Sequence, residues 1–212
     1  MTMRGRPVTL SEDDLLEVAG KVFIERGLDA TTAEIAQRAR ISESVIFHRY
    51  KTKEALFTAV FERHIVMPPA FARLPSRVGK GEVADNLFDA GMGVTDAMQR
   101  VLPFLMMALS SSKMNVLHKH KRAQHPLKRQ MVELLGGYCE GEAELGRLRG
   151  IQGAVFARAY LGGIMQQVMS EQVEGETDPL EIPEFLRGLI DLLLHGALPE
   201  RSRRPLRAAG RQ

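Results

Sequence analysis

The sequence predicts an all-α fold, and three observations lead to that prediction. Apolar residues recur three and four positions apart over several stretches, which is the spacing of one face of a helix. Sustained alternation of apolar and polar residues and hairpin dipeptides do not occur, so strand signals are nearly absent. Hydrophobic residues make up 44% of the 212 residues, enough for one large or two small cores. We expect about nine helices.

The first helix is expected to begin after Ser11, with Asp14 three residues later, and to end at Gly27. Its apolar face comprises Leu15, Val18, Ala19, Val22 and Phe23. That spacing suits a helix that packs against the two helices that follow it. Residues 1–9 are expected to form a flexible basic arm, the alternative being that Arg4 and Arg6 reach a DNA minor groove.

The segment from Thr31 to Lys53 predicts two short helices joined by a tight turn. Thr31 and Glu34 have the spacing of a capping box, which satisfies backbone N–H groups at a helix start. Arg40 and Ile41 are expected to make the turn. Such a pair of helices is the layout of a helix-turn-helix, whose second helix lies in the DNA major groove.

The second helix of this pair is expected to be capped by the hydroxyl of Ser42, with Val45 and Ile46 facing inward. Five basic residues and one acid lie between positions 35 and 53: Arg38, Arg40, Arg49, Lys51 and Lys53, with Glu43. Since the whole chain carries a net charge of only +3, affinity for nucleic acid depends on this local placement.

Thirteen residues at fixed spacings carry a family resemblance: Gly27, Thr31, Thr32, Ile35, Ala36, Ala39, Ile41, Ser42, Phe47, His48, Tyr50, Lys53 and Leu56. In this pattern the chain resembles the tetracycline-repressor-like (TetR) family of transcription regulators. Two positions depart from it. Arg40 stands where the family usually has Gly, so the turn differs or Arg40 adopts an unusual φ. Phe47 stands where a Tyr usually donates a hydrogen bond to a phosphate.

The resemblance and the spacing together predict the residues that contact DNA: Thr32, Ser42, Glu43, Ser44, Phe47, His48, Arg49 and Lys53. Glu43 and Ser44 occupy early positions of the second helix and are expected to read bases. Lys53 opens the fourth helix, where the helix dipole disfavours a cation, so a phosphate partner would explain it. The alternative is an ordinary solvated lysine. Tyr50 is expected to pack under the motif.

The fourth helix is expected to run from Lys53, capped by Thr52, to about Val66. The segment from Pro68 to Gly81 is expected to be a loop that contains the domain boundary. We therefore expect a DNA-binding domain with its connecting helix at 1–66, a helical ligand-binding and dimerisation domain at 67–200, and a basic tail at 201–212.

The remaining helices are expected at 82–100, 103–110, 126–148, 151–173 and from about Pro183 to Gly196. A basic, histidine-rich connector at 113–124 and an acidic loop at 174–178 separate them. The resemblance implies that the last two helices pair with their copies in a second subunit, giving a homodimer. Small residues such as Gly162 and Gly163 would allow that close approach.

Methionine and aromatic side chains in the middle of the chain either fill a core or line an adaptable ligand cavity. Residue type alone favours a core, whereas the resemblance implies a pocket for a small-molecule effector. The candidate ligand-binding residues are Phe88, Met92, Phe104, Met107, Met131, Tyr138 and Phe156.

Other kinds of site are not indicated. His118, His120 and His125 lack the spacing of a metal site, and no cofactor is expected. Cys139 is the only cysteine and is expected to fill a core. The longest apolar run, 101–109, is too short to span a membrane, and we expect a soluble cytoplasmic protein. Without a Gly-rich phosphate loop or catalytic constellation, the sequence does not predict an enzyme.

The sequence thus predicts a sequence-specific DNA-binding transcription regulator, a repressor that a small molecule releases from a palindromic operator. One alternative is a helical small-molecule carrier or enzyme with a merely structural basic motif. The other is a DNA-binding regulator without an inducer.

Overall fold

The computed structural model describes residues 10–110, 126–174 and 180–196, and these residues form nine α-helices and no strand. The all-α prediction is confirmed. The helices are α1 (Glu12–Arg26), α2 (Thr32–Ala39), α3 (Glu43–Tyr50), α4 (Lys53–His64), α5 (Pro69–Ala72), α6 (Val83–Ser110), α8 (Pro126–Glu144), α9 (Gly153–Met169) and α10 (Ile182–His195).

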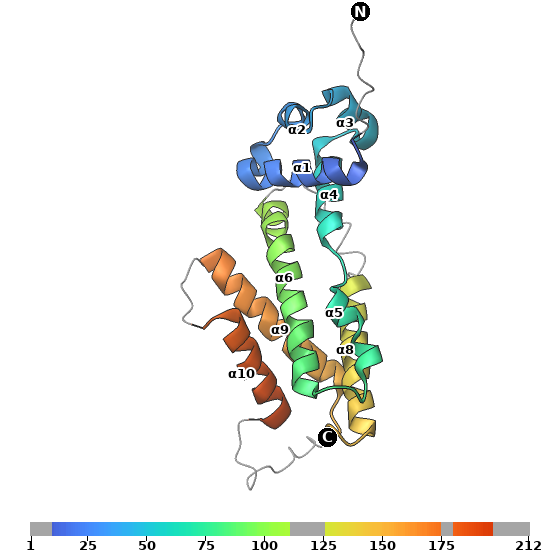
Figure 1. Ribbon diagram of the computed structural model, residues 1–212. Coiled ribbons are helices and arrows are strands. Elements are labelled where there is room, and N and C mark those ends of the chain that lie inside the picture. Colours follow the sequence, from blue (N-terminus) through green and yellow to red (C-terminus); the bar gives the residue numbers. More distant parts are fainter. Residues whose placement is uncertain (1–9, 111–125, 175–179, 197–212) are drawn as a thin grey trace, which may run out of the picture.

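The molecule is elongated, with α1, α2 and α3 at one end and α6, α8, α9 and α10 extending away from them (Figure 1). Buried apolar side chains form two clusters. The first holds α1 to α4 together and also takes in Phe104 and Ala108 from the end of α6. The second joins α5, α6, α8, α9 and α10. The two clusters support a division near residue 66, which stays a proposal.

The start of the chain follows its predicted signals. The Ser11 hydroxyl accepts a hydrogen bond of 3.1 Å from the Asp14 N–H, and Gly27 ends α1 with a φ of 61°. Thr52 caps α4 by accepting from the Ala55 N–H. Across the first cluster, the rings of Phe23 and Phe57 pack edge to face with centroids 5.1 Å apart. Local signals and burial therefore agree over α1 and α4.

Two predictions for the middle of the chain are wrong. The segment 68–81 is not a plain loop, because Pro69 begins the short helix α5 and a 3₁₀ turn follows at Leu74–Arg77. Proline favours the first turn of a helix, where its missing N–H costs nothing. The expected helices 82–100 and 103–110 are one helix, α6, which continues through Pro103. Pro103 lacks one backbone donor, but its neighbours Leu102 and Phe104 are both buried, which favours an unbroken helix.

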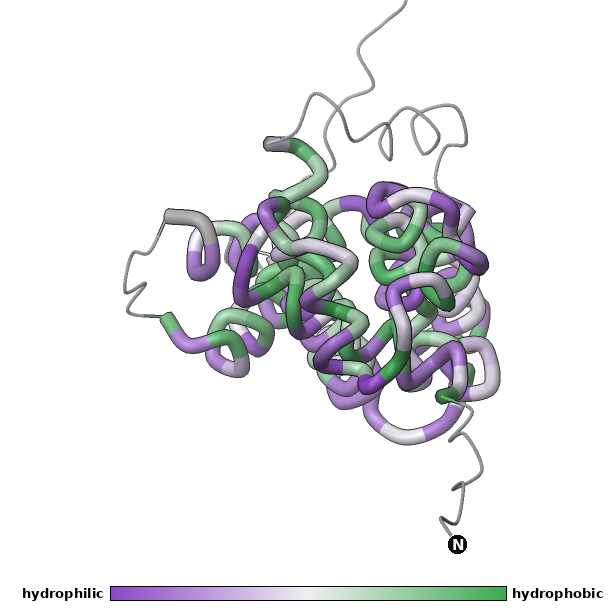
Figure 2. Tube along the Cα trace, turned by 90° about the horizontal axis from the view of Figure 1, so that it is seen from above, coloured by the Kyte–Doolittle hydropathy of each residue, from purple (hydrophilic) through white to green (hydrophobic). Residues whose placement is uncertain are grey.

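The later helices end earlier than their patterns suggested. α8 stops at Glu144 and Gly146 adopts a φ of 72°, and α9 stops at Met169 before a π-helical turn over Ser170–Glu174. Figure 2, seen from above, shows hydrophobic and hydrophilic residues alternating along the helices, as expected when one face is buried. Cys139 is fully buried, as predicted. Burial raises the pKa of its thiol to about 12.

Close contact between helices explains why a glycine lies inside α6. A Cβ on Gly91 would lie 2.3 Å from the Tyr160 hydroxyl oxygen. The Tyr160 hydroxyl donates a 2.5 Å hydrogen bond to the Leu87 carbonyl oxygen. Gly91 therefore lets α9 approach α6, and its low helix propensity is offset by packing.

Several expected features lie outside the described residues: the N-terminal arginines, His118, His120, His125 and the basic tail. Within the part of the chain that the structure describes, no group of three histidine, cysteine or acidic side chains is arranged to hold a metal. None of the described helices is both long and apolar enough to cross a bilayer.

Candidate nucleic-acid interface

The start of α2 is fixed by its predicted capping box. The Thr31 N–H donates to a Glu34 carboxylate oxygen at 2.9 Å, and the Glu34 N–H donates to the Thr31 hydroxyl at 3.1 Å. The Thr31 N–H and the Thr31 hydroxyl both donate to the Glu34 carboxylate, and these two bonds lower the pKa of that carboxyl. Ile35 and Ala36 are buried one turn on. The cap thus sets where α2 begins, and the buried residues set which face it turns inward.

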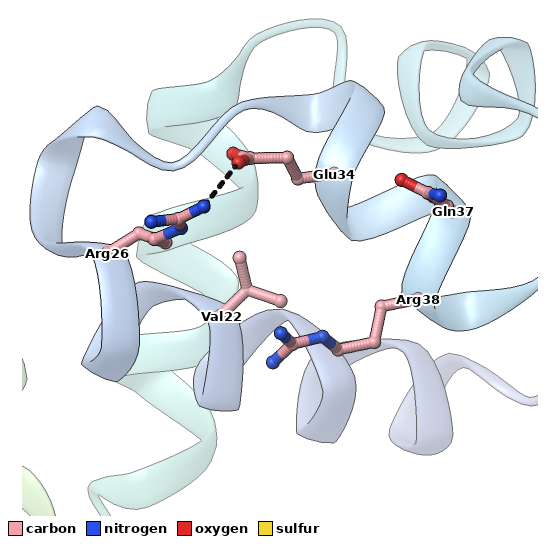
Figure 3. A pocket seen from close by; sticks show the side chains of 5 residues that line it. All are labelled: Val22, Arg26, Glu34, Gln37 and Arg38. Carbon is pink, nitrogen blue, oxygen red and sulfur yellow. Dashed lines mark ion pairs between the residues drawn. The ribbon is translucent and has the colours of Figure 1, made fainter.

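Ion pairs join α2 to α1 around a shallow hollow lined by Val22, Arg26, Glu34, Gln37 and Arg38 (Figure 3). Arg26 pairs with Glu34 at 3.5 Å, and Arg38 pairs with Glu25 at 2.6 Å. The Arg38 charge, expected to add to the basic face, is therefore shared with an acid. We interpret this hollow as structural.

The turn between α2 and α3 contains Arg40, which stands where the family usually has glycine. Arg40 adopts the left-handed conformation, with φ 56° and ψ 40°, and its N–H caps the end of α2. A side chain there is unfavourable relative to glycine, but the turn keeps its shape. The Arg40 side chain is exposed and adds positive charge beside α3.

The helix α3 presents one outward face. Ile46 is 1% exposed and anchors the helix in the first cluster. Ser44, Val45, His48 and Arg49 line a shallow surface depression. Val45, expected to face inward, is half-buried and also lines this depression. Ser44 and His48 are four positions apart and therefore share one face of the helix, while Ile46 between them lies on the buried face.

Phe47 lies 46% exposed on α3. A phenylalanine ring has no hydroxyl that could donate a hydrogen bond to a phosphate, but it can make apolar contact with a thymine methyl group or a sugar. Its exposure on a helix that otherwise turns polar groups outward is compatible with the predicted contact to DNA.

The expected capping role of Ser42 is wrong in its detail. Ser42 is the N-cap residue of α3 in extended conformation, but its side chain makes no capping hydrogen bond. Its hydroxyl instead lies 2.8 Å from the Ser44 hydroxyl. The N–H groups at the start of α3 are therefore not occupied by the Ser42 side chain, and a helix start of this kind favours phosphate.

Thr32 and Glu43 are bonded to each other. The Thr32 hydroxyl donates to the Glu43 carboxylate at 2.5 Å, and Thr32 is only 9% exposed. This contact joins the first turn of α2 to the first turn of α3. Both residues were predicted to contact DNA, and the sequence did not indicate that they contact each other.

Lys53 begins α4 as predicted, and the structure gives it a partner that the sequence did not suggest. Its ammonium group donates a 2.7 Å hydrogen bond to the Leu28 carbonyl oxygen, and the residue is half-buried. An ammonium has three donors, so this bond leaves capacity for a phosphate. The Leu28 contact fixes where the charge is held.

Tyr50 packs within the first cluster, and its hydroxyl donates to Glu12 at 3.0 Å. Partial burial, and then the bond to Glu12, raise the pKa of Tyr50 to about 12. Its contacts are therefore to α1, in keeping with its predicted place under the motif.

The candidate ligand residues do not converge on one site. An apolar cavity of about 420 Å³ lies among α6, α8 and α9, and of the seven candidates only Met131 lines it. Phe104 and Met107 belong to the first cluster, where the Phe104 ring stacks on His64 with centroids 4.8 Å apart. Tyr138 and Phe156 are buried in the second cluster, and Phe88 lies under the Arg187 guanidinium. Met92 packs against that cluster too.

Apart from Met131, the residues that line the cavity were not among the predicted ligand-binding residues. They are Val94, Met98, Val101, Leu102, Leu105, Leu127, Lys128, Met131, Val132, Arg158, Leu161, Gly162 and Met165. Recurrence of Val94, Met98, Val101 and Leu105 along one stripe of α6 is a signal that the sequence contained.

Comparison with known sequences finds matches for the N-terminal part. The family described as bacterial regulatory proteins, tetR family, matches residues 15–60. An uncharacterized HTH-type transcriptional regulator, YvkB of Bacillus subtilis (strain 168), is 37% identical over 51 residues. That stretch covers 24% of this chain, which spans only 27% of the length of that relative.

Solved structures share the fold over most of the chain. A putative TetR-family transcriptional regulator from Mesorhizobium loti MAFF303099 is 14% identical with a TM-score of 0.68, covering 85% of this chain and 93% of that one. The transcriptional regulator FadR from Bacillus subtilis, in complex with stearoyl-CoA, is 16% identical with a TM-score of 0.60, covering 87% and 98%. At these identities the likeness shows the fold alone.

Proposed function

Residues 15–60 match the tetR family of bacterial regulatory proteins, and on that premise we propose that the protein is a sequence-specific DNA-binding regulator of transcription. The observation that carries the proposal is the outward face of α3. Ser44, His48 and Arg49 are exposed together on it, beside Arg40 and the start of α4. A short helix held by one buried residue, with polar and basic groups outward, is suited to the major groove.

The contacts divide into two kinds. Ser44 and Glu43 lie in the first turn of α3 and read bases, with Phe47 adding apolar contact. Lys53, Arg49, His48 and the helix starts at Thr32 and Ser42 contact phosphates. Base contacts set the sequence, whereas phosphate contacts set the register and most of the affinity.

We propose a homodimer, because one α3 reads only a short half-site and two copies about 34–36 Å apart read a palindrome. The last two helices supply the surface. On α9, Val155 is 58% exposed, and on α10, Leu192 is 52% exposed. Apolar side chains this large are exposed at the surface of α9 and α10, which supports pairing with a second copy.

We further propose that the protein is a cytoplasmic repressor and that a small molecule releases it from its operator. The apolar cavity among α6, α8 and α9 supports this. One structural relative is a regulator in complex with stearoyl-CoA, which supports a ligand-binding role for this fold. We do not assign an enzymatic role.

Selection of bound fragments from a random DNA pool tests the proposal. We expect enrichment of a palindrome, retained at low salt and released as salt rises, since phosphate contacts release counterions. A shuffled fragment of the same composition is the control. A carrier or enzyme with a merely structural motif would enrich no sequence. A regulator without an inducer would enrich the palindrome while its cavity stayed empty.

A further inference from the structure

The cavity among α6, α8 and α9 has an uneven chemical lining. Its walls are aliphatic side chains and methionines, apart from two cations, Lys128 on α8 and Arg158 on α9. None of the described residues that line it is acidic. Three of the lining residues, Met98, Met131 and Met165, are methionines, whose flexible side chains adapt to the shape of an apolar guest.

Neither cation is matched by an acid. Arg158 has Ala154, Val155, Leu161 and Gly162 three and four positions away on α9, and Lys128 has Met131 and Val132 on α8. Neither takes part in any ion pair found among residues 10–110, 126–174 and 180–196. The Arg158 guanidinium makes one long bond, 3.5 Å, to the Ala154 carbonyl oxygen.

The neighbouring cation on α8 behaves differently. Arg129 pairs with Glu133 at 3.2 Å, one turn along the same helix. Surface cations in helices commonly have such partners. Lys128 and Arg158, which line the apolar cavity, have no such partner among the described residues.

We infer that this cavity binds an amphipathic anion, with its apolar body among the methionines and leucines and its carboxylate or similar group held by Lys128 and Arg158. The inference names the ligand class for the ligand-responsive regulator proposed above and rests on that proposal. Both cations are exposed, so the charged group stays partly hydrated while the apolar part is buried. Open space around Gly162, where a Cβ would meet nothing within 4 Å, leaves room beside Arg158.

Calorimetric titration of the full chain with three matched compounds tests the charge requirement. The probes are laurate and dodecyltrimethylammonium, each below its micelle concentration, and dodecanol below its solubility limit. We expect laurate to bind at least about tenfold more tightly than dodecanol, because charge-assisted hydrogen bonds are stronger than neutral ones. The cationic probe should bind most weakly. Equal affinities for laurate and dodecanol would overturn the inference.

Variants locate the charge. Arg158→Gln and Lys128→Gln should each lower laurate affinity about tenfold and leave dodecanol affinity unchanged. Arg129→Gln is the matched control and should bind laurate as the wild type does. If Arg129→Gln weakened laurate binding as much as the other two, the effect would be one of general charge and the assignment would be wrong.

Retention of the selected DNA fragment by the wild type, measured without laurate, reports on the proposed function separately. DNA retention without laurate binding overturns the ligand class alone. Laurate binding without DNA retention overturns the proposed function and leaves the cavity assignment standing.

Discussion

The Thr32 hydroxyl donates a 2.5 Å hydrogen bond to the Glu43 carboxylate, and so joins the two helices of the helix-turn-helix at their N-terminal ends. Thr32 belongs to α2 and is 9% exposed, whereas Glu43 begins α3 and is half-buried. This hydrogen bond fixes the orientation of the Glu43 carboxylate in the protein without DNA. Glu43 is thus a base-reading candidate whose position depends on another residue.

Replacing Thr32 with Val removes that donor and keeps the side-chain volume. We expect the free energy of unfolding to fall by about 1–2 kcal/mol, because a partly buried carboxylate loses a partner. The base preference should also change at the position that Glu43 reads. Thermal unfolding and selection from a random pool measure the two effects. Thr58→Val, which removes an exposed hydroxyl on α4, is the control. An unchanged preference would show that Glu43 is positioned without Thr32.

Lys53→Ala should weaken binding to all DNA sequences alike. The ammonium held at the Leu28 carbonyl is expected to contact phosphate, so its loss should also reduce the salt slope by about one. Ser44→Ala or Glu43→Ala should instead shift base preference by about 1–3 kcal/mol at one or two positions. Binding measured over a salt series on several fragments separates these effects. Lys21→Ala, on α1 and paired with Glu17, is the control. A change in preference with Lys53→Ala would reverse the roles.

The proposed dimer is best tested at Leu192. Leu192 is exposed on α10, whereas Leu189 packs on Gly163 within its own subunit, 3.0 Å from a Cβ placed there. Leu192→Arg should therefore dissociate the dimer, at a cost of several kcal/mol for burying a charge, while the monomer stays folded. Leu189→Arg should lower unfolding stability as well. Sedimentation and thermal unfolding distinguish the two, and a wild-type monomer at micromolar concentration would contradict the proposal.

Local signals account for what the sequence predicted well. The caps at Ser11, Thr31 and Thr52 each depend on residues three positions apart, so the chain itself specifies them. Arg40 in place of the usual glycine indicated either a different turn or an unusual φ, and the structure has the unusual φ. Burial of Ile46 followed from helical spacing.

Contacts between distant residues account for what the sequence missed. Nothing near Lys53 in the chain indicates the Leu28 carbonyl, 25 positions away. Phe104 was grouped with ligand-binding residues because it is aromatic, yet it packs on α4. Residue type identified methionines and aromatics, but which of them line a cavity depends on how three helices pack.

An ion pair between α1 and α4 predicts a pH dependence of stability. The Arg63 guanidinium donates to the two Asp13 carboxylate oxygens at 2.6 and 3.0 Å. This hydrogen bonding lowers the pKa of Asp13 below its ordinary value of 3.8. Because the folded-state pKa is the lower one, the stabilisation is present above the ordinary value and is lost as pH falls through the folded-state pKa.

Asp13→Asn should therefore lower the thermal midpoint near neutral pH and have no effect at the acid end. Since Asp13 is exposed, the difference should be small and reduced by salt. Midpoints measured for both proteins across acidic to neutral pH check this, with Asp96→Asn on α6 as the control. A gap between the two proteins that widens toward acid would contradict the assigned direction.

The last prediction concerns how a ligand would reach the DNA-binding end, and α6 is the element that touches both. Val101, Leu102 and Leu105 line the cavity, while Phe104 between them contacts Phe57 and His64 of α4. A ligand that moves this stretch of α6 therefore moves α4, whose first residue is Lys53. Only a ligand that prefers the moved state shifts the population, with coupling of about 1–3 kcal/mol.

Reciprocity requires the selected DNA to weaken laurate binding by the factor by which laurate weakens DNA binding. Titrating laurate with and without the DNA fragment measures the first factor, and titrating DNA with and without laurate measures the second. Phe104→Leu keeps an apolar side chain but loses the ring contacts with Phe57 and His64, so it should reduce both factors together while each ligand alone still binds. Met169→Leu, at the far end of α9, is the matched control. If laurate affinity were the same with and without DNA, laurate would bind the cavity without acting as an inducer. If Phe104→Leu left both factors intact, the coupling would run through a contact other than the one between α6 and α4.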